Sequence, residues 1–158
     1  MLEFQGKNDG RDLRIGIVVS RWNSNITEGL LRGALRALIA SDVAEDSITV
    51  VRVPGAWEIP LAAKQLATSA RYNAIVALGC VIKGETAHFE YISAAALEGI
   101  RKVSLELQIP ITCGILTTYT EEQALDRAGD NEDNKGSEAA LSAIEMSRLF
   151  HGIPKSTE

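Results

Sequence analysis

Apolar runs rich in β-branched residues alternate along this chain with segments in which apolar residues recur every three or four positions. A short apolar run of the first kind is typical of a buried strand, and the second period is typical of an amphipathic helix. Strand-like runs occupy residues 15–19, 48–53, 74–82 and 111–116, and helix-like segments occupy 26–40, 57–70, 89–107, 121–127 and 137–150. Pro60 must then lie in the first turn of its helix, where a missing N–H costs little.

Strands that are apolar throughout and alternate with helices predict a parallel sheet covered on both faces. The expected fold is a three-layer α-β-α sandwich with a four-stranded parallel sheet, which is flavodoxin-like. The chain has 158 residues, which suits one domain with a substantial core. We expect this domain at residues 13–150, an N-terminal arm at 1–12 and a C-terminal tail at 151–158, with both ends loose or bound by a neighbouring subunit.

Composition argues against several classes of function. The chain is 46% hydrophobic and 23% charged, with a net charge of −5, so nucleic acid and an anionic membrane are not expected partners. No apolar run reaches the roughly 18 residues of a membrane span. Residues 1–14 lack the apolar core of a signal peptide, which predicts a cytoplasmic protein.

The cysteines and the isolated cations have plain interpretations. Cys80 and Cys113 are expected to be small buried hydrophobic residues rather than a disulfide. Together with only two histidines, they show no ligand spacing, so no metal site is predicted. Arg127 and Lys135 flank an acidic loop, and taken alone they fit a solvated surface with its counter-charges.

Ligands of open parallel sheets bind beyond the carboxyl ends of the strands, which here selects residues 21–23, 55–58, 84–88 and 113–118. Gly84 and Thr86 stand where a helix begins, and the unpaired N–H groups there suit a phosphate. The alternative is an ordinary helix cap formed by Thr86 with Glu90. His88 lies in the same turn, where the helix dipole favours a neutral ring suited to proton transfer. The alternative for His88 is a half-buried ring bonded to a backbone carbonyl.

The loops after the first two strands carry the remaining candidates. Trp22 could stack on a planar ligand, or it could be a hydrophobic plug or a subunit contact. Asn23 and Glu58 are the nearest hydrogen-bonding groups and suit hydroxyls or ring N–H donors. Glu58 could equally be a first-turn acid favoured by the helix dipole. Gly55 and Ala56 would let main-chain groups reach a ligand.

The motifs RWN, VPGAWEIP, GCVIKGETAHFEY, CGILTT, RAG and NKGSEAALSAIEM occur in this order between about residues 13 and 150. In order and spacing they resemble the lumazine synthase family (6,7-dimethyl-8-ribityllumazine synthase). The resemblance implies a transferase that performs the penultimate step of riboflavin biosynthesis without a metal or an organic cofactor. In that reaction 5-amino-6-(D-ribitylamino)uracil and 3,4-dihydroxy-2-butanone 4-phosphate condense to 6,7-dimethyl-8-ribityllumazine, with release of phosphate and water.

The resemblance also implies site residues by position. His88 matches the acid/base group of the family. The positions implied to bind substrate are Trp22 against the pyrimidine, Asn23, Ala56 and Glu58 along the ribityl chain with Trp57 in the same loop, Val81 and Ile82 beside the uracil, Glu85, Thr86 and Arg127 around the phosphate, and Cys113 and Lys135 close to the ligand.

Members of this family form each site between adjacent subunits of a homopentamer, often with twelve pentamers in a 60-subunit icosahedral shell. The resemblance leaves riboflavin synthase open as a partner. On this pattern Cys113, Arg127 and Lys135 would serve a site across the interface from Trp22 and His88. An N-terminal strand at residues 2–5 could pair with a neighbour's sheet edge.

Three departures from the family pattern bear on the site and on the assembly. Cys113 stands where an aromatic ring is common, Glu85 replaces a small neutral residue, and residues 130–133 replace a loop that is often Thr-Lys-x-Gly. The unchanged loop length favours the icosahedral form, and the changed composition leaves a plain pentamer open. A flavin-binding carrier that uses Trp22, and a shell with an inactive site, are the two rival functions.

Overall fold

Four parallel strands form one sheet in the computed structural model of the chain, which describes residues 1–154. The strands are β1 (Ile15–Ser20), β2 (Ile48–Val53), β3 (Ala74–Ile82) and β4 (Ile111–Thr118), and they pair in the order β2-β1-β3-β4. Every residue of β1 and all but the last residue of β3 are buried, whereas β2 and β4 are partly exposed. The continuous apolar runs therefore mark the two central strands, as expected for a sheet covered on both faces.

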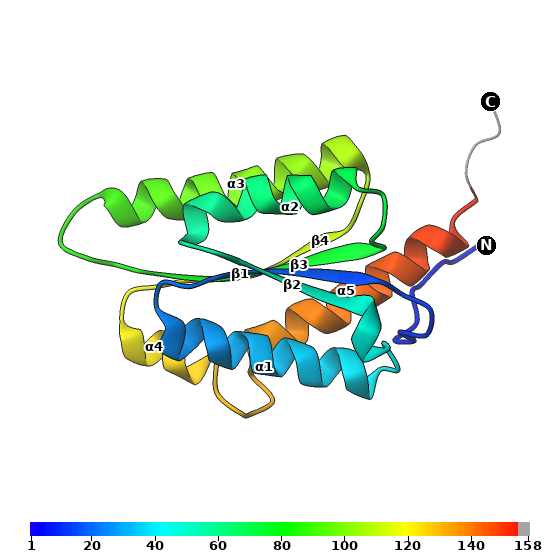
Figure 1. Ribbon diagram of the computed structural model, residues 1–158, viewed down its shortest axis with the longest axis horizontal. Helices are drawn as coiled ribbons and strands as arrows, with labels where there is room; N and C mark the ends of the chain where they lie inside the picture. The colour runs from blue at the N-terminus through cyan, green and yellow to red at the C-terminus, as the bar shows by residue number, and fades with distance from the viewer. Residues whose placement is uncertain (155–158) are drawn as a thin grey trace.

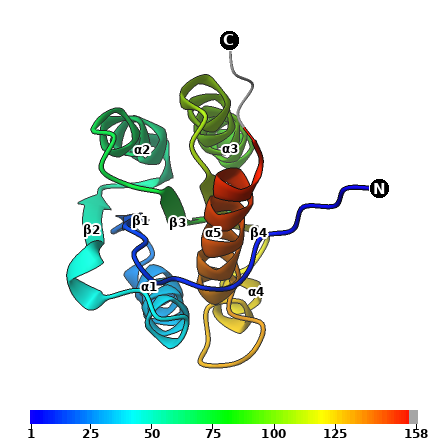
Figure 2. The same ribbon diagram turned by 90° about the vertical axis from the view of Figure 1, so that its right-hand side faces the viewer.

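Helices cover the two faces of the sheet and complete the three predicted layers (Figures 1 and 2). One face carries α1 (Ser24–Ala40), α4 (Glu121–Asp126) and α5 (Lys135–Gly152), and the other carries α2 (Ile59–Thr68) and α3 (His88–Leu107). Each face buries its own apolar cluster, one centred on α1 and α5 and the other on α2 and α3. The predicted three-layer, flavodoxin-like fold is confirmed. Within residues 1–154, none of the helices is both long and apolar enough to cross a membrane.

Several helix boundaries differ from the prediction by one or two residues, and two of these differences have clear local reasons. The helix predicted at 57–70 is divided into the 3₁₀ turn η2 (Ala56–Glu58) and α2, because the Glu58 carboxylate accepts a hydrogen bond from Gly55 N and tightens the first turn. A second 3₁₀ turn, η1 (Glu45–Ser47), precedes β2. The last helix begins two residues earlier than predicted because Asn134 caps it, and it continues to Gly152. Residues 155–158 of the predicted tail lie outside the described residues.

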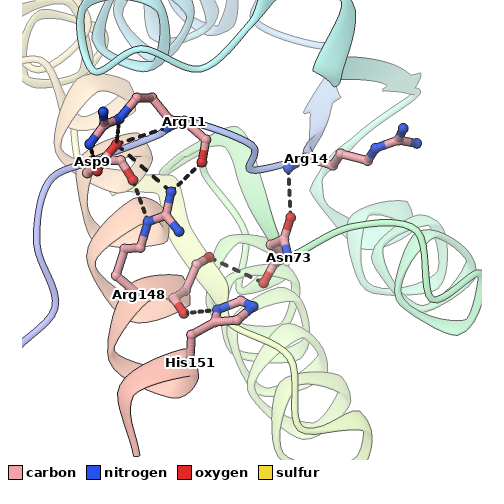
Figure 3. A network of polar contacts seen from close by, with 7 residues as sticks. Asp9, Arg11, Arg14, Asn73, Arg148 and His151 are labelled. Carbon is pink, nitrogen blue, oxygen red and sulfur yellow. Dashed lines mark hydrogen bonds and ion pairs between the residues drawn. The ribbon is translucent and has the colours of Figure 1, made fainter.

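The N-terminal arm crosses α5 (Figure 2), and its contacts with its own chain begin at Gly6. Arg148 of α5 donates from Nε to the Asp9 carbonyl at 2.6 Å and from Nη2 to the Arg11 carbonyl (Figure 3). A Cβ at Gly6 would lie 1.9 Å from the Glu145 carbonyl oxygen, so the arm crosses the α5 backbone in contact. Residues 6–12 are therefore held by their own chain. The prediction that the whole arm is loose is wrong for these residues.

The polar contacts at this end of the sheet also involve side chains of the arm itself. The side-chain hydrogen bond from Arg11 holds the pKa of the Asp9 carboxyl well below its usual range. Gly10 N donates to the Ser41 carbonyl at 2.6 Å, and Arg14 N donates to the Asn73 side chain at 2.7 Å (Figure 3). These bonds tie the arm to α1 and to the start of β3 as well as to α5.

Replacing Arg148 with alanine is expected to release the arm from α5. Two carbonyl oxygens would lose a charged donor, which predicts a loss of about 1–2 kcal/mol and at least about tenfold faster amide exchange in residues 6–12. Hydrogen exchange followed by mass spectrometry measures this locally. Arg148→Lys is the matched control. A lysine ammonium can keep the bond to one of the two carbonyls, so this variant should release the arm less than Arg148→Ala does. Unchanged exchange in Arg148→Ala would mean that the arm is held by other contacts.

Candidate functional site

The carboxyl ends of the first two strands are joined by backbone hydrogen bonds that place the Trp22 loop. Arg21 N donates to the Val53 carbonyl at 2.8 Å, and Trp22 N donates to the Pro54 carbonyl at 3.0 Å. The loop that leaves β1 is thus held against the loop that leaves β2. We call this end of the sheet, with the loops after β1, β2 and β3, the carboxyl rim.

At the carboxyl rim the Trp22 indole lies against Gly55. A Cβ at Gly55 would lie 2.4 Å from Cε3 and 2.6 Å from Cζ3 of the indole, so only glycine admits the ring in this position. The side chain nevertheless remains 64% exposed. Trp22 is therefore not a hydrophobic plug. Its ring is supported by Gly55 and leaves a large aromatic surface open. Gly55 accordingly leaves room for an aromatic side chain here, in addition to the predicted access of main-chain groups to a ligand.

Replacing Gly55 with alanine is expected to displace the Trp22 ring with little loss of stability, because an exposed side chain can rotate away from the new methyl group. In a Trp57→Phe background, acrylamide quenching of Trp22 fluorescence should increase, while the midpoint of thermal unfolding falls by no more than a few degrees. Gly84→Ala is the control, since a Cβ at Gly84 meets nothing within 4 Å. Equal quenching in the two glycine variants would show that Gly55 does not support the ring.

The hydrogen-bonding candidates of the carboxyl rim are partly occupied within the chain. Asn23 has a left-handed backbone (φ 58°), which asparagine tolerates, and its Nδ2 donates to the Cys80 carbonyl at 3.0 Å. Glu58 Oε2 accepts from Gly55 N at 3.0 Å, so Glu58 is a first-turn acid as well as a candidate ligand group. Ala56 is buried beside them, and Trp57 is 59% exposed. Each polar side chain is thereby held in place and keeps oxygen atoms without partners among the described residues.

The β3–α3 loop extends from the sheet as an open turn (Figure 1). Val81 is buried and Ile82 half-buried at the end of β3, whereas residues 83–88 are exposed. The main-chain N–H groups of Glu85 and Thr86 have no hydrogen-bond partner within residues 1–154. Nothing in the described chain covers these donors, so an anion can approach them from solvent.

Helix α3 begins at His88, and the cap differs from the one weighed from sequence. Ala87 is the N-cap residue and makes no side-chain cap bond, while Thr86 Oγ1 accepts from His88 N at 3.4 Å. In the part of the chain that the structure describes, Glu90 makes no reciprocal side-chain bond to Thr86. His88 is exposed and its ring is not bonded to a backbone carbonyl there, so the half-buried alternative for this residue is wrong.

Tyr119 holds both ends of this loop, and sequence reasoning missed it. Lys83 Nζ lies 5.4 Å above the Tyr119 ring, and the Phe89 ring centroid lies 6.2 Å from that of Tyr119. Lys83 N also donates to the Thr118 carbonyl at 2.9 Å. An aromatic residue directly after β4, the strand paired with β3, is a signal that would have indicated this contact.

Cys113 does not lie at the carboxyl rim, which corrects the prediction that grouped residues 113–118 there. It is the third residue of β4 and pairs with Ala77, whereas Asn23 reaches Cys80, whose partner on β4 is Leu116. Cys113 is also exposed, so its predicted burial is wrong, while Cys80 is buried as predicted. Burial raises the pKa of the Cys80 thiol to about 11, with a smaller contribution from Glu121, and partial burial also raises the pKa of Cys113.

Lys135 lies beside Cys113 at the outer edge of the sheet. The two line a shallow hollow with Thr112, Glu138, Ala139 and Ser142, and Cys113 also borders a second hollow against α3. Lys135 Nζ contacts the Glu138 carboxylate, and Arg127 at the end of α4 is exposed and donates to the Gln123 carbonyl at 2.9 Å. We call Cys113, Lys135 and this hollow the β4-edge group. It is separate from the carboxyl rim within one chain.

The candidate residues other than Arg127, which caps the end of α4, thus fall into two sets on one α/β domain. The carboxyl rim unites Trp22, Asn23, Ala56, Trp57, Glu58, Val81 and Ile82 with the exposed loop that contains Glu85, Thr86 and His88. Cys113 of the β4-edge group lies on β4, an edge strand that pairs with β3 alone among the described residues, and Lys135 is the first residue of α5. A family model described as 6,7-dimethyl-8-ribityllumazine synthase matches residues 12–151. This match spans almost all of the described domain, and the chain belongs to the 6,7-dimethyl-8-ribityllumazine synthase family.

Proposed function

We propose that this chain catalyses the condensation of 5-amino-6-(D-ribitylamino)uracil with 3,4-dihydroxy-2-butanone 4-phosphate, the penultimate step of riboflavin biosynthesis. The reaction forms 6,7-dimethyl-8-ribityllumazine and releases phosphate and water. Family membership supports lumazine synthesis in riboflavin biosynthesis as the general activity, and the choice of substrates follows from the family.

One observation carries the proposal: the supported, exposed indole of Trp22 lies on the same rim as a loop with unpaired main-chain donors. An aromatic surface suits a pyrimidine ring, because stacked rings attract one another beyond the area they bury. The N–H groups of Glu85 and Thr86, just before the N-cap of α3, suit a phosphate, because the positive end of the helix dipole adds to them. The carboxyl rim can therefore hold the two dissimilar substrates next to each other.

The proposed chemistry needs proton transfers and correct placement of the substrates. The aromatic amine attacks the ketone and forms an imine with loss of water, and the phosphate group leaves. The ribitylamino nitrogen then attacks the remaining carbonyl carbon and closes the ring with loss of a second water. Holding the two substrates together supplies a large part of the acceleration, because a bimolecular step becomes effectively unimolecular. His88, exposed at the first position of α3, is the proposed general acid and base beside the phosphate loop.

The His88→Ala variant tests this role. Its kcat should fall by about 10²-fold or more, whereas the KM values should change by less than about threefold, because a general acid–base acts mainly on the transition state. Lumazine formation is followed by its fluorescence with purified protein and both substrates. His151→Ala is the matched control, since His151 bonds the Ser147 carbonyl at the opposite end of the chain's fold.

The possible outcomes separate the proposal from its rivals. Full activity of His88→Ala would remove the acid–base role while leaving the overall reaction intact. A wild-type protein that binds riboflavin, turns yellow and forms no lumazine would favour a flavin carrier. A very large particle without turnover would favour a shell with an inactive site.

We further propose that the active site is shared between subunits of a homopentamer. The separation of the carboxyl rim from the β4-edge group supports this, because among the described residues Lys135 lines a hollow that does not include Trp22. The open edge of β4 is also available for contact with a second copy. A cytoplasmic 60-subunit shell, with riboflavin synthase as a partner, belongs to the same proposal.

A further inference from the structure

The side chain of Asn134 is completely buried between α1 and the loop that joins α4 to α5. Its exposed fraction is 0%. Nδ2 donates to the carbonyl of Gly29 at 3.1 Å and to the carbonyl of Gly129 at 2.8 Å, and Oδ1 accepts from Ser137 N at 3.0 Å. Both amide hydrogens and the oxygen are thus bonded to main-chain groups of three different segments.

Glycines at the contact surface bring these segments unusually close. A Cβ at Gly33 of α1 would lie 2.1 Å from the Asn134 oxygen, and a Cβ at Gly29 would lie 2.3 Å from the Ala128 carbonyl oxygen. On the other side, a Cβ at Gly136 would lie 2.0 Å from the Leu30 carbonyl oxygen. The backbone therefore packs directly on α1 both before the loop, at Ala128, and after it, at Gly136. Asn134 lies between these two contacts.

The side chains of Arg127 and Lys135 lie at the two ends of this segment, which packs on α1. Lys135 is the residue after Asn134, and Lys135 N donates to the Arg127 carbonyl at 2.9 Å. Arg127 stands two residues before Gly129, whose carbonyl the Asn134 amide binds. The residues between, 130–133, are exposed, and Asp130 pairs with Arg36 of α1. The Asn134 amide is thus the buried bridge between the backbone that carries Arg127 and the backbone that carries Lys135.

We propose that Asn134 is a positioning residue that sets the spacing of Arg127 and Lys135, the cations that receive the anionic substrate. The inference rests on the proposed function for the identity of that substrate. Asn134 does not touch the substrate and acts through the main chain, chiefly on Arg127. Binding of the phosphorylated substrate should therefore depend on Asn134 more than binding of the pyrimidine does.

The Asn134→Ser variant tests the bridge, because serine can still cap α5 but cannot donate to two carbonyls. We expect the KM for 3,4-dihydroxy-2-butanone 4-phosphate to rise by about tenfold, and the KM for the pyrimidine to change by less than about threefold. In an Arg127→Ala background the same substitution should raise the first KM by less than about twofold, because its effect passes through Arg127. Asn134→Asp, which keeps the shape and the cap, replaces the serine variant if that variant does not fold.

Asn73→Ala is the matched control for a purely structural role. The Asn73 side chain also joins two segments, just before the amino end of β3 and away from the carboxyl rim (Figure 3). Its loss should lower thermal stability without changing the ratio of the KM values for the two substrates. A serine variant that only loses stability, that raises both KM values equally, or that adds fully to Arg127→Ala would overturn the inference while leaving the proposed function intact.

Direct binding of inorganic phosphate, measured by calorimetry, separates the inference from the proposed function. If wild-type protein forms no lumazine but binds phosphate, the proposed function fails. Weaker phosphate binding in Asn134→Ser by about tenfold would then still support the positioning role, and equal binding would overturn it. Absence of phosphate binding in the wild type would overturn both.

Discussion

Replacing Gly136 with alanine is expected to lower the free energy of unfolding by about 3 kcal/mol, a large effect for a single methyl group. The new Cβ would lie 2.0 Å from the Leu30 carbonyl oxygen and 2.6 Å from the Leu30 carbonyl carbon. Both atoms belong to the backbone of α1, so no rotamer change relieves the contact. The helices α1 and α5 would have to separate, and the apolar cluster between them would lose packing. Urea denaturation at a fixed protein concentration measures the loss.

Gly152→Ala is the matched control for this substitution on the same helix. A Cβ at Gly152 meets nothing within 4 Å. Alanine has the higher helix propensity, so this variant should be as stable as the wild type or slightly more stable. If Gly136→Ala lost no more than Gly152→Ala, the close approach of α1 and α5 at Leu30 would not be required by the fold.

The elements of the fold could be predicted because they depend on short-range pattern. The apolar runs that became β1 and β3 are buried on both faces, and their alternation with helical segments predicts a covered parallel sheet. The helix ends were harder, because they depend on single side-chain bonds. The bond from Gly55 N to Glu58 divides η2 from α2, and the Asn134 cap starts α5 early.

The carboxyl rim was predictable from topology, whereas the contacts between distant segments were not. Parallel strands end together, so the loops with Trp22, Glu58 and His88 had to meet at one end of the sheet. The register of β4 instead depends on its pairing with β3, and it places Cys113 away from that end and exposed at the edge. Contacts such as Trp22 with Gly55 join residues far apart in the sequence, and no local period encodes them.

Two inactive variants should restore activity when they assemble together, if the site is shared between subunits. His88→Ala removes a group of the carboxyl rim, and Lys135→Ala removes a group of the β4 edge; we expect each alone to lose most activity. In a ring with one repeated interface, random mixing in equal amounts pairs an intact rim with an intact edge in about one quarter of the sites. Co-expressed protein should therefore recover about a quarter of the wild-type kcat per subunit.

The control for this experiment pairs two variants from the same group. Trp22→Ala and His88→Ala both damage the carboxyl rim, which a single chain supplies through the joined ends of β1, β2 and β3. Mixing them cannot create an intact rim, so no recovery is expected beyond the activity of each variant alone. Native mass spectrometry establishes that the mixed oligomers form. Mixed oligomers of the His88 and Lys135 variants without recovery would contradict a shared site, because complementary halves would then be present on neighbouring subunits and still fail to act together.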